Sequence, residues 1–261
     1  KQRIKISHFI STLAKEDTSV IAIEHDLIIL DYLTDLINIM YGQENAFGVV
    51  SAVKSTREGI NAFLEGYLKE ENVRFRSRAI KFDNSQNKES HLAEHLISWD
   101  NLSATLGTFK LSAPRGSIYK NEIIGVLGEN GIGKTSFIKI LAGVLKSEGN
   151  LSDEIRVSYK PQYLDSGSDA TVAEFLMKAI STYHTQLIKP LDIEKLYSQK
   201  LSELSGGQLQ RVAIAHCLSQ DADLFLLDEP SAYLDVEQRL LISKIMRNIK
   251  EERDITIMVV D

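Results

Sequence analysis

Residues 128–135 read Gly-Glu-Asn-Gly-Ile-Gly-Lys-Thr, the pattern of a phosphate-binding P-loop. An expected strand, residues 122–127, precedes this loop, and an expected helix, residues 133–145, follows it, as the pattern requires. Glycines let backbone N–H groups turn toward phosphate oxygens, and the helix start adds its positive dipole end. A glycine-rich loop without a ligand is the weaker alternative. The residues expected to bind nucleotide are Gly128, Glu129, Asn130, Gly131, Ile132, Gly133, Lys134, Thr135 and Ser136, with Lys134 on the β- and γ-phosphates of ATP and Thr135 on Mg²⁺.

A second acidic element supports the same chemistry. Four apolar residues separate Asp223 from Asp228, which places Asp228 at the carboxyl end of a buried strand. Ligands of open α/β sheets bind at that edge. We expect Asp228 to hold Mg²⁺ and Glu229 to orient or deprotonate the attacking water. Two adjacent acids that merely end a strand are the structural alternative.

Expected strands and helices alternate through the second half of the chain, which predicts a mainly parallel sheet. The expected strands are residues 122–127, 155–160, 223–228 and 255–260, and the expected helices are residues 133–145, 171–202 and 236–252.

The first half begins with a helical apolar spacing and continues with short strands and helices. Residues 83–91 contain no apolar residue and read as a linker. Asp26 and Ser55 are expected helix N-caps, the latter with Glu58 at capping-box spacing. The remaining expected elements are helices at residues 1–16, 27–36 and 55–66, and strands at residues 19–24, 37–41 and 47–53.

The chain contains an internal repeat. Residues 1–7, Lys-Gln-Arg-Ile-Lys-Ile-Ser, resemble residues 237–243, Glu-Gln-Arg-Leu-Leu-Ile-Ser. Each copy is expected to form a helix and then an apolar strand, residues 19–24 in the first copy and 255–260 in the second. The sequence therefore covers about one period of a tandem duplication.

Composition excludes several classes of protein. The 261 residues carry a net charge of -6, so no global basic field favours nucleic acid. The single cysteine, Cys217, can form no internal disulfide and cannot hold a zinc or iron–sulfur site alone. No run of 18 apolar residues and no signal peptide occur. We expect a cytoplasmic protein that does not bind a membrane.

Residues 204–208, Leu-Ser-Gly-Gly-Gln, resemble the signature motif of ABC ATPases. The resemblance implies an α/β P-loop cassette with a mainly parallel sheet, an antiparallel β subdomain and a helical signature subdomain. It implies that Ser205, Gly206, Gly207 and Gln208 contact the γ-phosphate of ATP held by an opposite cassette. Gln162 resembles the Q-loop glutamine, which senses Mg²⁺ and the attacking water, and His25 resembles the switch histidine at the γ-phosphate.

ABC cassettes stack the adenine base on an aromatic ring upstream of the P-loop. The usual tyrosine position holds Leu106 here, so Phe109 is the candidate contact. A phenylalanine that belongs to the core explains Phe109 equally well.

Residues 55–66 and 71–76 resemble the hinge between the cassettes of the E family of ABC proteins, the ribosome-recycling ATPases. The resemblance implies that residues 1–53 end a first cassette, residues 54–90 form the hinge and residues 91–261 are most of a second cassette. It implies partners as well: the other cassette, the small ribosomal subunit, and release or recycling factors. The family's 4Fe-4S clusters belong to an N-terminal domain that this chain cannot contain.

Arg74, Arg76, Arg78 and Lys81 alternate beside the hinge and would share one face of an extended segment. Contact with ribosomal RNA and a solvated or cassette-bound hinge are both open. Two other functions share the motifs: the ATPase subunit of a transporter, and a scaffold that binds nucleotide without hydrolysis. In a further arrangement, residues 1–53 complete the core of the second cassette, either in cis or by a swap between chains.

Overall fold

The computed structural model describes residues 2–15, 17–43, 46–77, 79–80, 94–152, 155–162 and 169–261. They form two compact units, one of residues 1–88 with 235–237 and one of residues 89–234 with 238–261. The expected linker, residues 83–91, lies outside the described residues.

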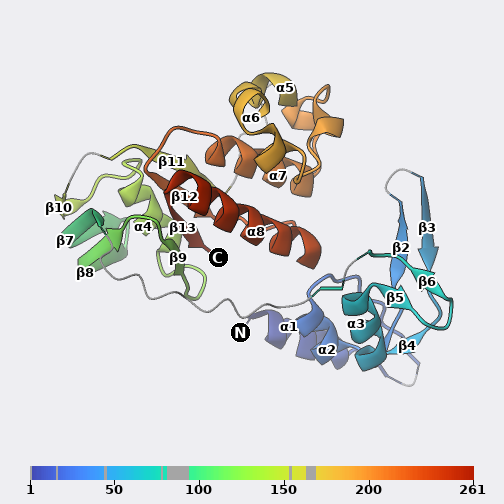
Figure 1. Cartoon of the computed structure of the whole chain (residues 1–261). Coiled ribbons are helices and arrows are strands. Elements are labelled where there is room, and N and C mark those ends of the chain that lie inside the picture. Colours follow the sequence, from blue (N-terminus) through green and yellow to red (C-terminus); the bar gives the residue numbers. More distant parts are fainter. Residues whose placement is uncertain are drawn as a thin grey trace. The chain divides into compact units, whose positions relative to one another are not determined.

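A four-stranded parallel sheet forms the centre of the second unit (Figure 1). Its order is β11 (Val157–Lys160), β12 (Leu224–Asp228), β13 (Thr256–Val260) and β9 (Ile123–Val126). The register aligns Lys160 with Leu227, and Asp228 with Val260, so the carboxyl ends of these strands share one edge. The expected parallel sheet is therefore confirmed.

The side chains of β12 alternate between two cores, because successive residues of a strand point to opposite faces. Phe225 and Leu227 join a cluster with α7 (Gly206–Leu218) and α8 (Val236–Arg253). The stretch expected to be mostly helical, residues 171–202, packs against this cluster as short helices, which break at Leu176, at Tyr183 and before Pro190. Pro190 lacks an N–H donor, which accounts for the last of these breaks. Those helices are α5 (Val172–Phe175), α6 (Met177–Thr182) and one-turn segments at His184–Ile188, Glu194–Leu196 and Leu201–Glu203.

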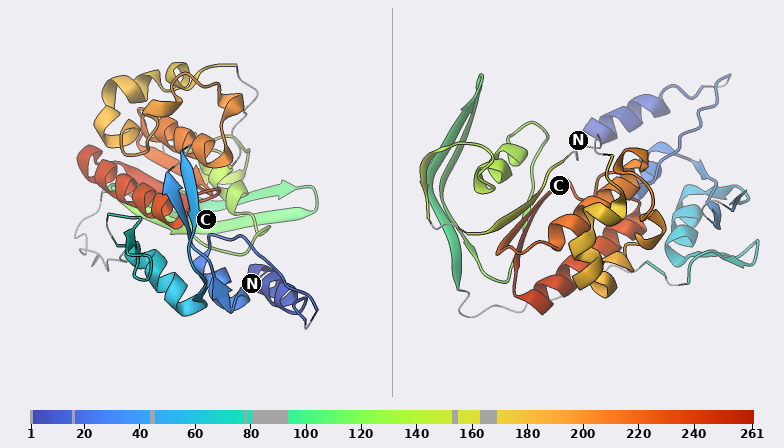
Figure 2. Two further views of the ribbon diagram at one scale, coloured as in Figure 1. Left: turned by 90° about the vertical axis from the view of Figure 1, so that its right-hand side faces the viewer. Right: turned by 90° about the horizontal axis from the view of Figure 1, so that it is seen from above.

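The opposite face of the parallel sheet is covered by α4 (Lys134–Leu141), which lies between it and an antiparallel sheet (Figure 2). That second sheet has the order β10 (Glu148–Leu151), β7 (His95–Leu106) and β8 (Phe109–Tyr119). Ile138 and Leu141 of α4 are buried with residues of both sheets. The edge-on contact of Trp99 with Phe137, 5.3 Å between ring centroids, joins β7 to α4. The P-loop is thereby anchored on a packed helix.

The first unit contains three helices and three two-stranded sheets among its described residues. Asp26 caps α2 by accepting from the N–H of Ile28, and Ser55 caps α3 by accepting from the N–H of Glu58, so both expected caps are confirmed. The helices are α1 (Gln2–Ser11), α2 (Leu27–Leu33) and α3 (Thr56–Glu65); the strand pairs are β1 (Leu36–Ile37) with β4 (Lys54–Ser55), β2 (Met40–Gln43) with β3 (Phe47–Val50), and β5 (Tyr67–Leu68) with β6 (Val73–Arg74).

One expected strand does not form. Residues 19–24 adopt no regular secondary structure, and the side chains of Ile21 and Ile23 are 92% and 97% exposed. A strand needs a neighbour for its N–H and C=O groups, and none of the described strands pairs with this segment. The expected helix at residues 27–36 is also shorter, because Thr34 is extended and ends it.

Among the described residues, none of the helices combines the length and the apolar character that a membrane span requires.

Candidate functional site

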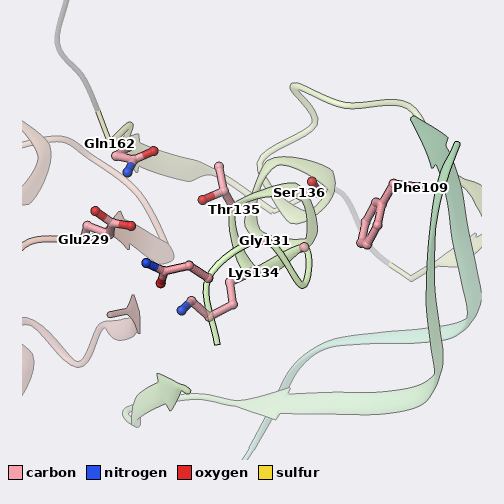
Figure 3. Close-up of a pocket in the computed structure, with 9 residues that line it drawn as sticks. Phe109, Gly131, Lys134, Thr135, Ser136, Gln162 and Glu229 are labelled. Carbon is pink, nitrogen blue, oxygen red and sulfur yellow. The ribbon is translucent and has the colours of Figure 1, made fainter. Parts of the chain in front are cut away.

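A cavity of about 320 Å³ lies at the carboxyl edge of the parallel sheet. Figure 3 shows Gln162 and Glu229 facing Thr135 and Lys134, with Phe109 on the other side of the loop. Loops and elements far apart in the sequence thus meet at one place. The lining residues are Phe109, Asn130, Gly131, Gly133, Lys134, Thr135, Ser136, Gln162 and Glu229.

The backbone of the P-loop depends on glycine at two positions. Gly131 and Gly133 have φ angles of 83° and 96°, in the left-handed region that other residues rarely adopt. A Cβ atom at Gly133 would also lie 2.8 Å from Cζ of Phe109. Gly133 is the N-cap of α4 and supplies no side-chain cap, so the N–H groups of the first helical turn face the loop without a capping oxygen.

Two hydrogen bonds fix the P-loop, one within the loop and one to the sheet. The Nζ of Lys134 donates to the carbonyl oxygen of Gly128 at 2.6 Å. The hydroxyl of Thr135 donates to Oδ1 of Asp228 at 3.1 Å, which joins the start of α4 to the end of β12. Glu129 and Ile132 belong to the loop but do not line the cavity.

Glu229 follows the last residue of β12 and is half-buried. Its φ of 46° is in the left-handed region, although it carries a side chain. Gln162 comes two residues after the end of β11 and is also half-buried. The two side chains therefore reach the cavity from adjacent strands.

Burial dominates the electrostatics beside the cavity. It raises the pKa of Asp228, which is fully buried, and the neighbouring Glu229 carboxylate adds to the shift, whereas the Thr135 hydrogen bond opposes it. Burial also lowers the pKa of Lys160 to about 8 and raises that of Tyr159 to about 12. Two buried or half-buried acids at one sheet edge give a site that favours a cation.

Phe109 begins β8 and contacts the P-loop at Gly133. It is half-buried and lines the cavity, whereas Leu106 is 37% exposed and does not. Its ring is thus available from the cavity and also packs on the loop.

The signature residues lie outside the cavity, at the start of α7. Ser205 and Gln208 form a capping box: the Ser205 N–H donates to Oε1 of Gln208 at 2.9 Å, and the Gln208 N–H donates to Oγ of Ser205 at 3.4 Å. A Cβ atom at Gly206 would lie 3.1 Å from Cγ of Tyr233. Neither these residues nor Gly207 line the cavity.

His25 belongs to the first compact unit and does not line the cavity. Its backbone N–H donates to Oε1 of Glu24 at 2.9 Å, and its Nδ1 lies 3.3 Å from the same oxygen.

The basic alternation beside the hinge does not share one environment. Arg74 is exposed and lies over the ring of Tyr67, 5.3 Å from its centroid. The guanidinium of Arg76 contacts the rings of Phe63 and Phe75, at 4.7 and 5.5 Å, and donates to the carbonyl oxygen of Phe63. Arg76 is therefore occupied within its own unit; Arg78 and Lys81 lie outside the described residues.

Sequence reasoning missed three residues next to the site: Tyr159, Lys160 and Gln210. The Tyr159 hydroxyl lies 3.5 Å from Oδ2 of Asp228, and the Lys160 Nζ lies 2.9 Å from the carbonyl oxygen of Asp228. A lysine as the last residue of a strand that ends at the carboxyl edge of the sheet could have signalled Lys160. The Nε2 of Gln210 donates to the carbonyl oxygen of Glu229 at 2.7 Å. No sequence signal marked Gln210, because this contact depends on how α7 packs.

The family model described as "ABC transporter" matches residues 111–232. An uncharacterized ABC transporter ATP-binding protein of Methanocaldococcus jannaschii is 52% identical, over 95% of this chain and 43% of its own length. A translation initiation factor of Saccharomyces cerevisiae is 42% identical, over 95% of this chain and 42% of its own length. The chain thus spans less than half the length of these relatives. An ABC transporter E family member of Arabidopsis thaliana is 42% identical over 56% of this chain and 88% of its own length.

Two solved structures are similar over nearly the whole chain. An archaeal ribosome recycling factor in complex with an archaeal ribosomal stalk protein is 47% identical, with a TM-score of 0.86, over 99% of this chain and 52% of its own. A ribosome-bound archaeal complex of Pelota and ABCE1 gives a TM-score of 0.92 at 48% identity, over 100% of this chain and 45% of its own. The chain therefore belongs to the E family of ABC-type ATPases.

Proposed function

We propose that the second unit binds ATP with Mg²⁺ and hydrolyses it to ADP and phosphate. The observation that carries this proposal is the convergence of Lys134, Thr135, Gln162 and Glu229 on one cavity at the carboxyl edge of the sheet. Positive, hydroxyl, amide and carboxylate groups are the set that phosphoryl transfer needs for charge stabilisation and for positioning water.

Each group has a defined task in this proposal. The Lys134 ammonium exchanges the Gly128 carbonyl for β- and γ-phosphate oxygens, and the uncapped N–H groups in the first turn of α4 bind phosphate. Glu229 orients the attacking water and accepts its proton. Phe109 stacks on adenine, which explains a ring that lines the cavity and lies on the P-loop.

The donor set fits Mg²⁺, which prefers oxygen ligands and keeps several of its waters. Thr135 and Asp228 already lie together, 3.1 Å between their oxygens, and Gln162 lines the same cavity. The buried carboxylate of Asp228 gains most from a cation, since burial disfavours its charge. When bound, the ion supplies neutralisation of phosphate charge.

We infer that the chain is part of a tandem protein, in which residues 1–53 end one cassette, residues 54–90 form the hinge and residues 91–261 belong to the second cassette. Ser205, Gly206, Gly207 and Gln208 then face ATP held by the other cassette, in agreement with their place outside this cavity. His25 serves the first cassette's ATP. Alone, this chain binds ATP but hydrolyses it weakly, because each site needs both cassettes.

The work done by closure of the two cassettes is the splitting of ribosomes in the cytoplasm. Two similar structures support this step, since one is of an archaeal ribosome recycling factor and the other is of ribosome-bound Pelota and ABCE1. The small ribosomal subunit and recycling factors are the partners in this proposal. Exposed Arg74 is the described residue of the basic alternation best placed for ribosomal RNA.

The test uses Glu229→Gln in the full-length protein. ATP binding should persist, turnover should fall at least about 100-fold because the water loses its base, and the protein should sediment with small ribosomal subunits only when ATP and Mg²⁺ are present. Normal turnover would refute the role of Glu229. Intact ATP binding without sedimentation would be compatible with the proposed ATPase activity but would rule out the ribosome as the partner.

A further inference from the structure

The backbone at Glu229 is held in an uncommon conformation. Its φ of 46° is in the left-handed region, which costs energy for any residue with a Cβ atom. Such a conformation persists only when surrounding contacts determine it. The direction of the Glu229 carboxylate depends on this backbone, so the contacts that hold it bear on the proposed chemistry.

The peptide group before Glu229 is bound at both ends. Its carbonyl oxygen, which belongs to Asp228, accepts from Nζ of Lys160 at 2.9 Å. Its N–H, which belongs to Glu229, donates to the carbonyl oxygen of Val260 at 2.7 Å. Lys160 comes from β11 and Val260 from β13, so both strands adjacent to β12 hold the same peptide plane.

The peptide group after Glu229 is bound from a helix. The carbonyl oxygen of Glu229 accepts from Nε2 of Gln210 at 2.7 Å and from the N–H of Ala232 at 3.3 Å. Gln210 lies on α7 and is only 5% exposed. The helix that begins with the signature residues is thus joined directly to the backbone of the proposed catalytic acid.

Of Lys160 and Gln210, the lysine has the side chain whose burial is less favourable in free energy. Lys160 is 2% exposed, and placing an ammonium group in the interior is unfavourable unless its hydrogen bonds are made. Its Nζ donates to two main-chain carbonyls, those of Asp228 and Pro161. It thereby ties the loop that carries Gln162 to the peptide that precedes Glu229.

We propose that Lys160 and Gln210 are positioning residues for Glu229. They hold the peptide groups on its two sides and so orient its carboxylate toward the attacking water. Lys160 links the orientation of this carboxylate to the loop that carries Gln162, and Gln210 links it to α7, the helix that begins with the signature residues. This inference rests on the proposed hydrolysis of ATP. Neither side chain lines the cavity, so neither contacts nucleotide in this arrangement.

The experiment compares Lys160→Met and Gln210→Met in the full-length protein, each alone and combined with Glu229→Ala. Methionine keeps an unbranched stem and removes the donor. The control is Gln220→Met. Gln220 follows the C-terminal end of α7, and its side-chain amide donates to the carbonyl oxygen of His216. The measurements are kcat and KM for ATP, the Kd of a fluorescent ATP analogue, single-turnover phosphate release and the melting temperature.

We expect each variant to lower kcat about 10- to 100-fold, the scale of a misplaced catalytic group, while the Kd of the analogue changes less than about twofold. With Glu229→Ala present, the same substitutions should cause no further loss of phosphate release, because the group they position is gone. Gln220→Met should leave kcat unchanged.

Three outcomes would overturn the inference: unchanged kcat in both variants, an equal further loss with Glu229→Ala present, or weaker analogue binding in proportion to the loss of kcat. If Lys160→Met does not fold, Gln210→Met decides alone. If Glu229→Ala itself keeps normal turnover, the proposed role of Glu229 fails, and the inference fails with it. If Glu229→Ala abolishes turnover and the two variants do not lower it, only the inference fails.

Discussion

The two copies of the internal repeat share a pattern but differ in structure. In the second copy, α8 leads to β13, which lies between β12 and β9, and Met258 and Val260 are 2% and 0% exposed. In the first copy, α1 forms, but the apolar run that follows stays irregular, and Ile21 and Ile23 are 92% and 97% exposed. The same apolar pattern is therefore a strand only where partner strands flank it.

The first copy is held by local hydrogen bonds instead. Oε1 of Glu24 accepts from the N–H groups of His25 and Asp26, at 2.9 and 3.1 Å, and Oδ1 of Asp26 accepts from the N–H of Ile28 at 3.0 Å. These contacts join residues one or two positions apart, so they need no other part of the fold. Residues close in sequence therefore hold the first copy, whereas strands close in space hold the second.

Hydrogen exchange should show the largest difference. The amides of β13 are expected to exchange at least about 10³-fold more slowly than those of residues 20–24, because core strands open only with global unfolding. In the full-length protein, residues 20–24 should gain protection from added partner strands. Mass spectrometry of peptides from both copies would measure this, and equal protection of the two segments in this chain would contradict the comparison.

Matched substitutions should give the next largest effect. Met258→Ala is expected to lower the free energy of unfolding by about 2–5 kcal/mol, through lost burial and a cavity. Ile21→Ala, in the corresponding apolar run of the first copy, should change it by less than about 0.5 kcal/mol. Urea unfolding followed by far-ultraviolet circular dichroism and by Trp99 fluorescence would test both, and similar losses would show that Ile21 is buried in solution.

The local contacts of the first copy should respond to Asp26→Ala. Loss of an N-cap costs about 1 kcal/mol, so the amides of α2 should exchange about fivefold faster. Asp26→Ser, which keeps a capping oxygen, is the control and should restore most of the protection. An unchanged rate in Asp26→Ala would mean that the cap seen here does not stabilise α2.

The stability of the second unit is expected to depend weakly on pH through His216. Burial lowers the pKa of His216, which stacks on Phe175 at 4.2 Å between ring centroids. Below about pH 6.5 the unfolded chain binds a proton that the folded chain resists, so stability falls as pH falls, by no more than about 1.4 kcal/mol per pH unit. Urea unfolding between pH 7.5 and 5.5 should show a smaller loss of stability in His216→Phe than in the unmodified chain. An equal change in the free energy of unfolding with pH in both proteins would contradict this prediction.

The fold of the second unit followed closely from the sequence, because apolar runs and glycine spacing encode buried strands and the loop at their edge. Val157–Lys160 and Leu224–Asp228 were expected within two residues of their observed bounds. The prediction of a strand at residues 19–24 was wrong, because an apolar run does not reveal whether neighbouring strands are present to pair with it. The roles of Phe109 and His25 stay predictions, since both depend on groups that the chain does not contain.

By itself the sequence determined the glycine-rich loop between β9 and α4, the place of Asp228 and Glu229 at the end of β12, the capping of α2 and α3, and membership of the ABC ATPases. Each of these depends on residues close in the chain or on a strand followed by a helix. Only the tertiary structure decided which apolar run becomes a strand and which side chains surround Glu229. Lys160, Val260 and Gln210 come from three separate elements. Their meeting depends on strand order and helix packing, which local sequence does not encode.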